Sequence, residues 1–241
     1  MSTPIGNLED LSLRAANVLT SIDYLACEDS RQTGQLIKRL PALFPALKTK
    51  GLSPRYLSYF EGNENSRIPQ IISLLQTGQD VALVSNAGTP LVSDPGFKLV
   101  RTCVEKKISV VSIPGPCAAI TALTCSGQPT DQFLFLGFLP KKAGKRERLL
   151  QSLKGISSTI TPTVIIYLSP HRFYKELIAI EKTFGNMVIT LCRELTKLHE
   201  ETIQIMITEV LQKYQSNPPK GELILLFSLK DLPLQKLTTS N

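Results

Sequence analysis

The chain has 241 residues, of which 42% are hydrophobic, and it carries a net charge of +7. This length fits one large or two small domains, and no apolar run approaches the ~20 residues that cross a bilayer. The N-terminal residues show no signal peptide, so we expect a cytoplasmic protein with no membrane partner. Five scattered cysteines without a C-x-x-C pair, and only two histidines, predict neither a disulfide framework nor a metal site.

The positive charge is unevenly distributed. Residues 1–113 carry a net charge of +2 and the remainder of the chain carries +5. Excess positive charge favours a polyanionic partner, because phosphate contacts release counterions. The absence of Trp and an aromatic content of 6% argue against the usual stacking-rich single-strand binder.

Strand-like and helix-like segments alternate through the first half of the chain. Such a rhythm predicts a parallel sheet with right-handed crossovers. In chain order we expect a helix over 11–19 capped by Asp10, a strand over 23–27, a helix over 30–40, a strand over 56–60, a helix over 63–76, a strand over 81–85, a helix over 97–107 and a strand over 110–113.

The P-G-P segment at 114–116 breaks regular structure and predicts a hinge, after which the alternation resumes. We expect helices over 117–126, 145–154, 172–184 and 208–214, and strands over 133–138, 164–168, 187–191 and 222–229. The chain therefore divides into two α/β domains, 1–113 and 114–231, followed by a flexible tail, 232–241. A ligand is expected between the domains or at the carboxyl ends of strands.

The loop after the strand at 81–85 is rich in glycine and proline: it reads S-N-A-G-T-P-L-V-S-D-P-G over residues 85–96. Gly88 and Gly96 lack a Cβ, so a ligand can approach the backbone closely. The alternative is a rigid structural connection in which Asp94 caps the next helix. The loop after the strand at 110–113, P-G-P-C-A-A, also consists of residues with small side chains. Its alanines taken alone favour close helix packing.

Three further segments carry charged side chains. K-K-A-G-K-R-E-R, residues 141–148, is either a solvated basic face or a phosphate contact. His171, in Y-L-S-P-H-R, is more simply a capping or packing residue than a ligand. C-R-E-L-T-K, residues 192–197, is either a salt-bridged cluster or part of a site at a strand end. No G-x-G-x-x-G or G-x-x-x-x-G-K-[ST] motif is present, which argues against dehydrogenases and P-loop enzymes.

Eight stretches in this order together resemble one family: T-P-I-G-N-L-E-D, C-E-D-S-R, L-V-S-N-A-G-T-P-L-V-S-D-P-G, I-P-G-P-C-A-A-I-T-A-L, G-F-L-P-K-K, Y-L-S-P-H-R, C-R-E-L-T-K and K-G-E. They are similar to the bacterial small-subunit ribosomal RNA ribose 2′-O-methyltransferases of the tetrapyrrole-methylase-like superfamily, which act on a decoding-region cytidine. The resemblance spans nearly the whole chain.

This resemblance implies two α/β domains that bind S-adenosyl-L-methionine in the cleft between them, a homodimer, and small-subunit ribosomal RNA or the assembled subunit as substrate. The cofactor-binding residues that it implies are Gly6, Ala87, Gly88, Thr89, Pro90, Asp94, Pro114, Cys117, Ala118, Ala119, Tyr167, Arg193, Gly221 and Glu222. The RNA contacts that we expect are Lys141, Lys142, Lys145, Arg146, Arg148 and Arg172.

A ribose hydroxyl is a poor nucleophile until a base withdraws its proton. Candidate bases are Glu28, Asp29 and Glu194. The structural alternative for each is an ion pair, with Arg31 for the first two or with Arg193 for the third.

Three departures from the family pattern leave alternatives open. Asn86 stands where the family usually has Asp, and Leu168 where Glu is usual. The family also has an apolar strand before T-P-I-G-N, so we expect that this first strand is missing here and that the gene product starts several residues earlier. These departures motivate a second hypothesis, a catalytically weakened RNA-binding ribosome-assembly factor. A third is a tetrapyrrole methylase of the same superfamily.

Overall fold

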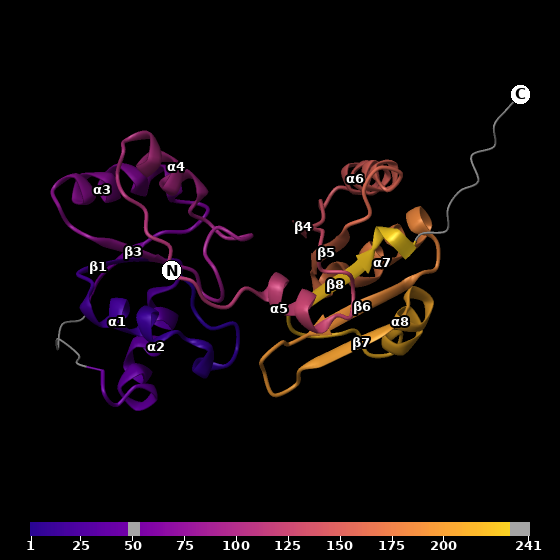
Figure 1. Ribbon diagram of the computed structural model, residues 1–241, viewed down its shortest axis with the longest axis horizontal. Helices are drawn as coiled ribbons and strands as arrows, with labels where there is room; N and C mark the ends of the chain where they lie inside the picture. Colours follow the sequence, from indigo (N-terminus) through magenta and orange to yellow (C-terminus); the bar gives the residue numbers. More distant parts are fainter. Residues whose placement is uncertain (48–53, 232–241) are drawn as a thin grey trace, which may run out of the picture. The chain divides into compact units, whose positions relative to one another are not determined.

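The computed structural model describes residues 1–47 and 54–231, so the predicted flexible tail at 232–241 lies outside the described residues. The chain divides into two compact units, the first covering Met1–Cys117 and the second beginning at Ala118 (Figure 1). The division falls shortly after the boundary that the P-G-P segment predicts.

The first unit contains a three-stranded parallel sheet. Its strands are β1 (Tyr24–Cys27), β2 (Arg55–Ser58) and β3 (Val81–Val84), in the order β2-β1-β3. Each strand is followed by a helix, as the alternating pattern predicts, and the parallel pairing is confirmed. The carboxyl ends of the three strands therefore meet at one edge of the sheet, from which Glu28 and the 85–96 loop begin.

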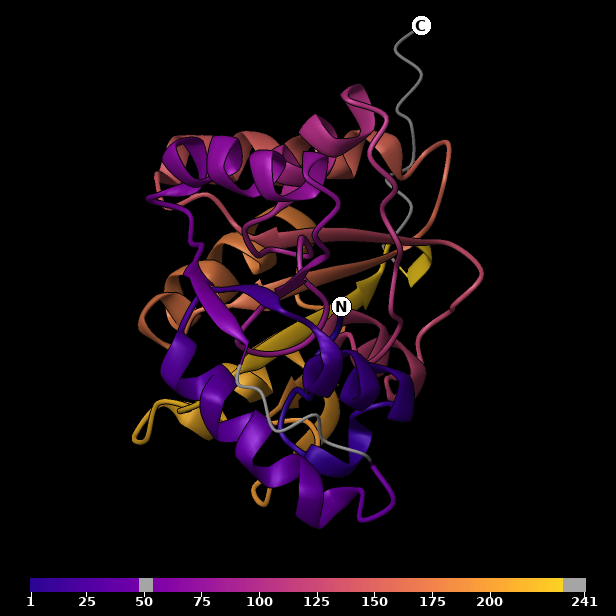
Figure 2. The ribbon, with the colours of Figure 1, turned by 90° about the vertical axis from the view of Figure 1, so that its left-hand side faces the viewer.

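Helices cover both faces of this sheet. A short helix η1 (Leu8–Asp10) precedes α1 (Leu13–Ser21) and α2 (Ser30–Leu43), which bury Leu19 and Leu40 against Leu25 of β1. On the other face, α3 (Glu64–Gln76) and α4 (Phe97–Glu105) bury Ile71 and Leu99. Neighbouring residues of β1 enter different cores because side chains alternate along a strand. Figures 1 and 2 both show the two helix layers on opposite sides of the strands.

Two predictions for this unit are wrong. The cap of α1 is Ser12, whose hydroxyl accepts from the amide of Ala15 at 3.1 Å, whereas Asp10 ends η1. Residues 110–113 form no strand. The main chain of the N-terminus lies between them and β3, because Met1 donates to the Leu83 carbonyl and Ser2 donates to the Ile113 carbonyl.

The second unit contains a mixed five-stranded sheet. Its strands are β4 (Phe133–Phe138), β5 (Thr163–Leu168), β6 (Val188–Arg193), β7 (Glu201–Met206) and β8 (Leu223–Ser228), in the order β4-β5-β8-β6-β7. Only β4 and β5 pair in parallel, and the other three pairs are antiparallel. A parallel sheet throughout is therefore wrong for this unit, and β7 was not predicted.

Helices α6 (Ala143–Ile156), α7 (Phe173–Phe184) and α8 (Ile207–Tyr214) share one apolar core with the sheet, which includes Leu150, Ile166 and Leu177. The short helix η2 (Pro170–Arg172) directly precedes α7. A second short helix, η3 (Leu229–Asp231), follows β8 and ends the described chain. Helix α5 (Ala118–Cys125) contacts β5 and β8 and contributes no residue to that core, so it packs on the other face. None of the helices described is long and apolar enough to cross a membrane.

Candidate functional site

Three segments of the first unit are tied together beyond the carboxyl end of β3. Thr3 and Gly88 exchange two main-chain hydrogen bonds, of 2.9 and 3.1 Å, and the Thr3 hydroxyl donates to the Ser85 carbonyl. The Thr89 hydroxyl donates to the carbonyl of Pro116 at 2.9 Å and lies 2.9 Å from the Ser2 hydroxyl. Residues 2–6, 85–90 and 113–117 therefore form one loop cluster.

Close packing in the loop cluster requires glycine. Gly88 has φ +78°, a conformation that L side chains rarely adopt, and a Cβ there would lie 3.2 Å from the Ile5 Cγ2 atom. A Cβ on Gly115 would lie 2.8 Å from the Ser2 Cβ. Since Gly6, Ala87 and Pro114 are exposed, the cluster presents main chain and small side chains at its surface. Of the predicted cofactor residues, those at 6, 87–90, 114 and 117 lie in these segments, and Ala118 follows the last segment directly.

The loop of residues 85–96 is also strained. Leu91 and Ser93 have φ of +72° and +65°, and each such non-glycine residue costs about 1–3 kcal/mol and persists only because the surrounding structure enforces it. Gly96, which precedes α4, has φ +132°, and a Cβ there would lie 2.7 Å from Leu91 and 2.8 Å from Leu83. Gly96 occupies the N-cap position of α4, so the interpretation of Asp94 as the cap residue is wrong.

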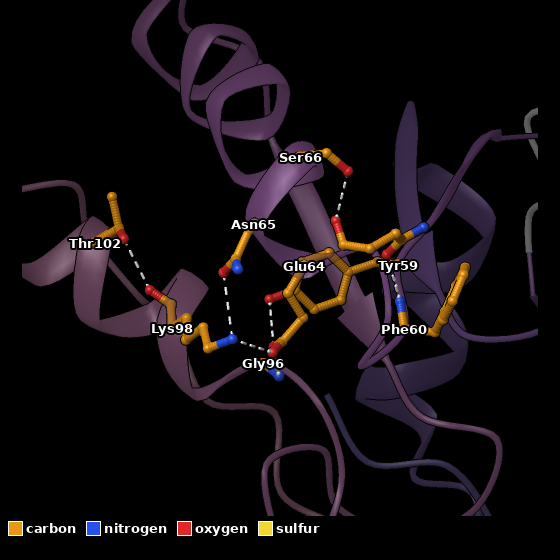
Figure 3. Close-up of polar contacts among 9 residues, drawn as sticks. Tyr59, Phe60, Glu64, Asn65, Ser66, Gly96, Lys98 and Thr102 are labelled. Atoms are coloured by element: carbon orange, nitrogen blue, oxygen red, sulfur yellow. Dashed lines mark hydrogen bonds and ion pairs between the residues drawn. The ribbon is translucent and has the colours of Figure 1, made fainter.

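A buried carboxylate holds the far end of this loop (Figure 3). The Glu64 Oε1 atom accepts from the Gly96 amide at 2.9 Å and from the Tyr59 hydroxyl at 2.9 Å. Lys98, which also donates to Asn65, lies 3.3 Å from the other oxygen, Oε2. These contacts join the end of β2, the start of α3 and the start of α4.

Electrostatics keep the Glu64 carboxylate charged. Burial opposes its ionisation, but the bonds from Tyr59, Gly96 and Lys98 outweigh burial and hold the pKa of Glu64 below its ordinary value. Burial and the neighbouring carboxylate raise the pKa of Tyr59. Sequence reasoning missed this network: position 64 opens a helix, but nothing local in the sequence indicates its partner at Gly96.

The first two candidate bases follow β1 and have different surroundings. Asp29 caps α2 by accepting from the Arg31 amide at 2.8 Å, and the Arg31 guanidinium lies 3.0 Å from the other carboxylate oxygen. These bonds lower the pKa of Asp29, and the structural interpretation of this residue is confirmed. Glu28 is half-buried and has no hydrogen bond or ion pair to any residue in the described part of the chain.

The third candidate base, Glu194, is held by two hydrogen bonds within the second unit. Its Oε1 atom accepts from the Glu222 amide at 2.8 Å and from Lys197 at 2.9 Å. Burial opposes ionisation, yet these two bonds outweigh it and lower the pKa of Glu194. A Cβ on Gly221 would lie 2.4 Å from the Glu194 Cδ, so glycine is required for this contact.

The neighbouring Arg193 belongs to a salt-bridged cluster, as one interpretation of C-R-E-L-T-K predicts. Its Nε atom lies 3.3 Å from Glu201, which also contacts Lys213 and accepts from the Tyr214 hydroxyl at 2.9 Å. Burial and Glu201 together raise the pKa of Tyr214 to about 12. Cofactor binding by Arg193, Gly221 and Glu222 stays a prediction.

The basic segment at 141–148 is only partly available for phosphate. Its four exposed cations are Lys141, Lys142, Lys145 and Arg148; we call them the cationic strip. Arg146 is 8% exposed and points to the carbonyls of Pro140 and Lys141, at 3.4 and 3.5 Å. Its predicted RNA contact is therefore wrong, because the guanidinium faces the interior.

Arg172 and Arg146 neutralise a buried acid. The Arg172 Nη1 atom lies 2.9 Å from Glu176, whose side chain is fully buried, and donates to the Leu139 carbonyl at 2.7 Å. Burial raises the pKa of Glu176, and the charges of Arg172 and Arg146 oppose that rise. Arg172 is thus engaged in structure, and an RNA contact by it stays a prediction.

Three other predicted or altered positions lie in packed regions. Ala119 is 2% exposed on α5, which supports close helix packing rather than a ligand contact. Leu168 is 2% exposed within the apolar core, so the side chain at this position belongs to no polar site. Tyr167, one residue earlier, is half-buried on the opposite face of β5 beside Phe135 and Phe138.

Comparison with known proteins identifies the class. The chain matches the model of the Tetrapyrrole (Corrin/Porphyrin) Methylases over residues 2–211, and it belongs to that family. It is similar to the crystal structure of the native uroporphyrin III C-methyl transferase from Thermus thermophilus, with a TM-score of 0.63, 14% identity and coverage of 94% of this chain and 95% of that one. At this identity the likeness concerns the fold alone, and it confirms the predicted α/β architecture.

Closer relatives carry a more specific name. The chain is 43% identical to the ribosomal RNA small subunit methyltransferase I of Hydrogenobaculum sp. (strain Y04AAS1), over 97% of this chain and 96% of the relative. It is 40% identical to the protein of the same name from Escherichia coli O157:H7, over 98% and 81%. These similarities confirm the resemblance drawn from the eight sequence stretches.

Proposed function

We propose that the protein is an S-adenosyl-L-methionine-dependent methyltransferase that acts on the ribose 2′-hydroxyl of a cytidine in the decoding region of small-subunit ribosomal RNA. The observation that carries the proposal is the similarity, over nearly the full length, to relatives named ribosomal RNA small subunit methyltransferase I. A structure solved with S-adenyl homocysteine shares the fold, with a TM-score of 0.59 at 15% identity.

The loop cluster suits the donor molecule. The donor has an amino acid end, two ribose hydroxyls and a flat adenine, all of which main-chain groups can bind when no side chain blocks the approach. Gly88 supplies such a bend, and a Cβ would close the small space between it and Ile5. When bound, the donor supplies a methyl group on a sulfonium sulfur, and the chain's own residues bind and orient it.

Glu28 is our candidate for the base that takes the proton of the ribose hydroxyl. It follows β1 at the same sheet edge as the 85–96 loop, and its carboxylate is not committed to another described residue. Asp29 and Glu194 are weaker candidates, since cations and amides already hold their oxygens. General base catalysis typically contributes ~10²–10⁴-fold.

The cationic strip supports a polyanionic substrate. Its four exposed cations fall within the first turns of α6 and the preceding loop, where they can contact successive phosphates. A homodimer, which the resemblance implies, and a cytoplasmic location complete the proposal. The substrate is small-subunit ribosomal RNA, either free or in the assembled subunit.

The test is methylation of purified small subunits, and of free ribosomal RNA, with labelled cofactor, followed by mapping of the labelled nucleotide. We expect one labelled ribose for the wild type. Glu28→Gln should lose ~10²-fold or more in turnover at saturating cofactor while calorimetry finds unchanged cofactor affinity. Asp80→Asn is the matched control, because it removes an exposed charge just before β3, at the end of that strand opposite to the 85–96 loop.

The other hypotheses predict different results. A ribosome-assembly factor without activity binds RNA but gives no calorimetric signal with S-adenosyl-L-methionine. A tetrapyrrole methylase methylates uroporphyrinogen and leaves the subunit unlabelled. A labelled base instead of a labelled ribose would refute 2′-O-methylation, and full turnover by Glu28→Gln would remove that residue as the base.

A further inference from the structure

Three aromatic rings from β4 and β5 meet on one face of the sheet of the second unit. The Tyr167 ring lies edge-on to Phe135, with centroids 4.9 Å apart, and edge-on to Phe138, with centroids 5.6 Å apart. Phe138 is the last residue of β4, and 53% of it is exposed. Exposed phenylalanine is unfavourable in water, and a flat ligand that covered this ring would remove that cost.

The backbone of β4 turns Phe138 toward Tyr167. Leu134 and Leu136 pack on the apolar core, and in a regular strand Phe138 would follow them to that face. The register shifts between Phe135 and Phe138, and Gly137 has φ +61°. Two residues of β4, Leu136 and Gly137, therefore lie opposite the single residue Ile166 of β5, and Phe138 moves to the face of Phe135. Irregularities of this kind commonly re-aim a side chain next to a functional site.

The cationic strip begins three residues after this ring, and the segment between them is held firmly. Arg172 donates to the Leu139 carbonyl at 2.7 Å, and Arg146 contacts the carbonyl of Pro140. Arg172 also forms an ion pair of 2.9 Å with the buried Glu176, and the charge of Arg146 opposes the rise in the pKa of Glu176. The position of Phe138 relative to Lys141 and Lys142 is thereby fixed by buried charges rather than left to a mobile loop.

An exposed, rigid aromatic ring next to cations matches one ligand chemistry, a nucleobase attached to a phosphate backbone. We propose that Phe138, supported by Phe135 and Tyr167, stacks on an unpaired base of the RNA while Lys141 and Lys142 contact its phosphates. A duplex offers no free base face, so the ring selects a splayed or single-stranded nucleotide. This inference rests on the proposed function, because it assigns a recognition site for the same RNA.

The test measures binding without catalysis. Fluorescence anisotropy of a short labelled single-stranded RNA carrying a central cytidine compares the wild type with Phe138→Ala, Phe138→Leu and Phe138→Tyr. Stacking contributes ~1–3 kcal/mol per base, so we expect Phe138→Ala to weaken binding about 5- to 150-fold. Phe138→Leu should lose most of that affinity, because it keeps apolar area without a flat ring, and Phe138→Tyr should keep it. Ile178→Ala, which truncates a 54% exposed apolar residue on α7, is the control and should bind as the wild type.

A second RNA with an abasic site separates stacking from misfolding. If the ring stacks on a base, the wild type and Phe138→Ala bind the correctly placed abasic RNA equally well, and moving the abasic site along the strand identifies which nucleotide is stacked. Equal affinity of Phe138→Ala and wild type for the intact RNA overturns the inference, as does a Phe138→Ala defect that persists at every abasic position. A wild type that binds in this ring-dependent way but methylates no subunit would refute the proposed function and leave the stacking site standing.

Discussion

The Glu64 network should govern the stability of the first unit through the hydrogen bonds that Glu64 accepts from Gly96 and Tyr59, rather than through its ion pair with Lys98. Glu64→Ala leaves the Gly96 amide and the Tyr59 hydroxyl without their acceptor. Each unsatisfied buried donor costs about 1–3 kcal/mol, so we expect a loss of about 2–6 kcal/mol in the free energy of unfolding. That is a large fraction of the ~5–15 kcal/mol that a folded protein usually has.

Two further variants separate the contributions. Glu64→Gln keeps one carbonyl oxygen as an acceptor and removes only the charge, so a smaller loss of about 1–2 kcal/mol is expected. Lys98→Ala breaks the ion pair, but half of the Lys98 side chain is exposed, and such pairs contribute at most ~1 kcal/mol. The expected order of destabilisation is Glu64→Ala, then Glu64→Gln, then Lys98→Ala.

The assay is urea unfolding of the three variants and the wild type near neutral pH, followed by calorimetric titration with S-adenosyl-L-methionine. The pKa of Glu64 is lowered in the fold, so its contribution is present above the unfolded-state pKa and is lost as pH falls through the lower folded-state value. The wild type should therefore lose its advantage over Glu64→Gln in acid. If Lys98→Ala lowers the free energy of unfolding as much as Glu64→Ala does, the reasoning is refuted, because the ion pair would then be the source of the stabilisation.

Three other predictions follow from single contacts. Gly88→Ala should cost about 1–3 kcal/mol through its positive φ and should weaken cofactor affinity in the same titration, whereas Gly144→Ala, in open space within α6, should be neutral or stabilising. Glu194→Gln should lower the free energy of unfolding near neutral pH, because it removes a carboxylate whose pKa is lowered in the fold. In urea unfolding at a series of pH values, the difference from the wild type should disappear as pH falls through that lowered pKa. Glu176→Ala leaves two arginines facing a buried site and should cost about 3–5 kcal/mol by thermal or urea unfolding; the exposed Glu147→Ala should not exceed ~1 kcal/mol.

Local pattern was enough to find most elements of this fold. The short apolar runs at β1 and β3 are bounded by helices with clear periodicity, so both the strands and their parallel pairing could be predicted. β7 was missed although E-T-I-Q-I-M carries a signal: Ile203 and Ile205 alternate with Thr202 and Gln204, as in a half-buried strand at a sheet edge. The strand expected at 110–113 failed for the opposite reason: V-V-S-I has strand composition, but Val110 and Val111 are 49% and 65% exposed without a neighbouring ladder.

The residues of the candidate site could also be predicted where the signal is local in sequence, and not where it depends on residues far along the chain. The glycines of the 85–96 loop indicate unusual backbone, and the structure shows positive φ at Gly88 and Gly96. The cations at 141–148 were evident too, but sequence does not tell an outward Lys145 from an inward Arg146. Arg146 points instead to the carbonyls of Pro140 and Lys141, which are main-chain groups that any sequence would provide.

Glu64 and Glu176 position main chain in a similar way, the first at the end of the 85–96 loop and the second just before the 141–148 segment. Each is a buried acid near the start of a helix, and each acts on main chain: Glu64 accepts directly from the Gly96 amide, and Glu176 holds Arg172, which donates to the Leu139 carbonyl. A glycine amide and a carbonyl carry no side-chain signature, so neither partner can be recognised from sequence. Because a loop that binds a ligand cannot bury its own apolar side chains there, its geometry must be fixed from behind, and a buried charge bound to main chain does this without occupying the ligand's side. The residues that shape such a site are therefore the ones that motif comparison is least able to find.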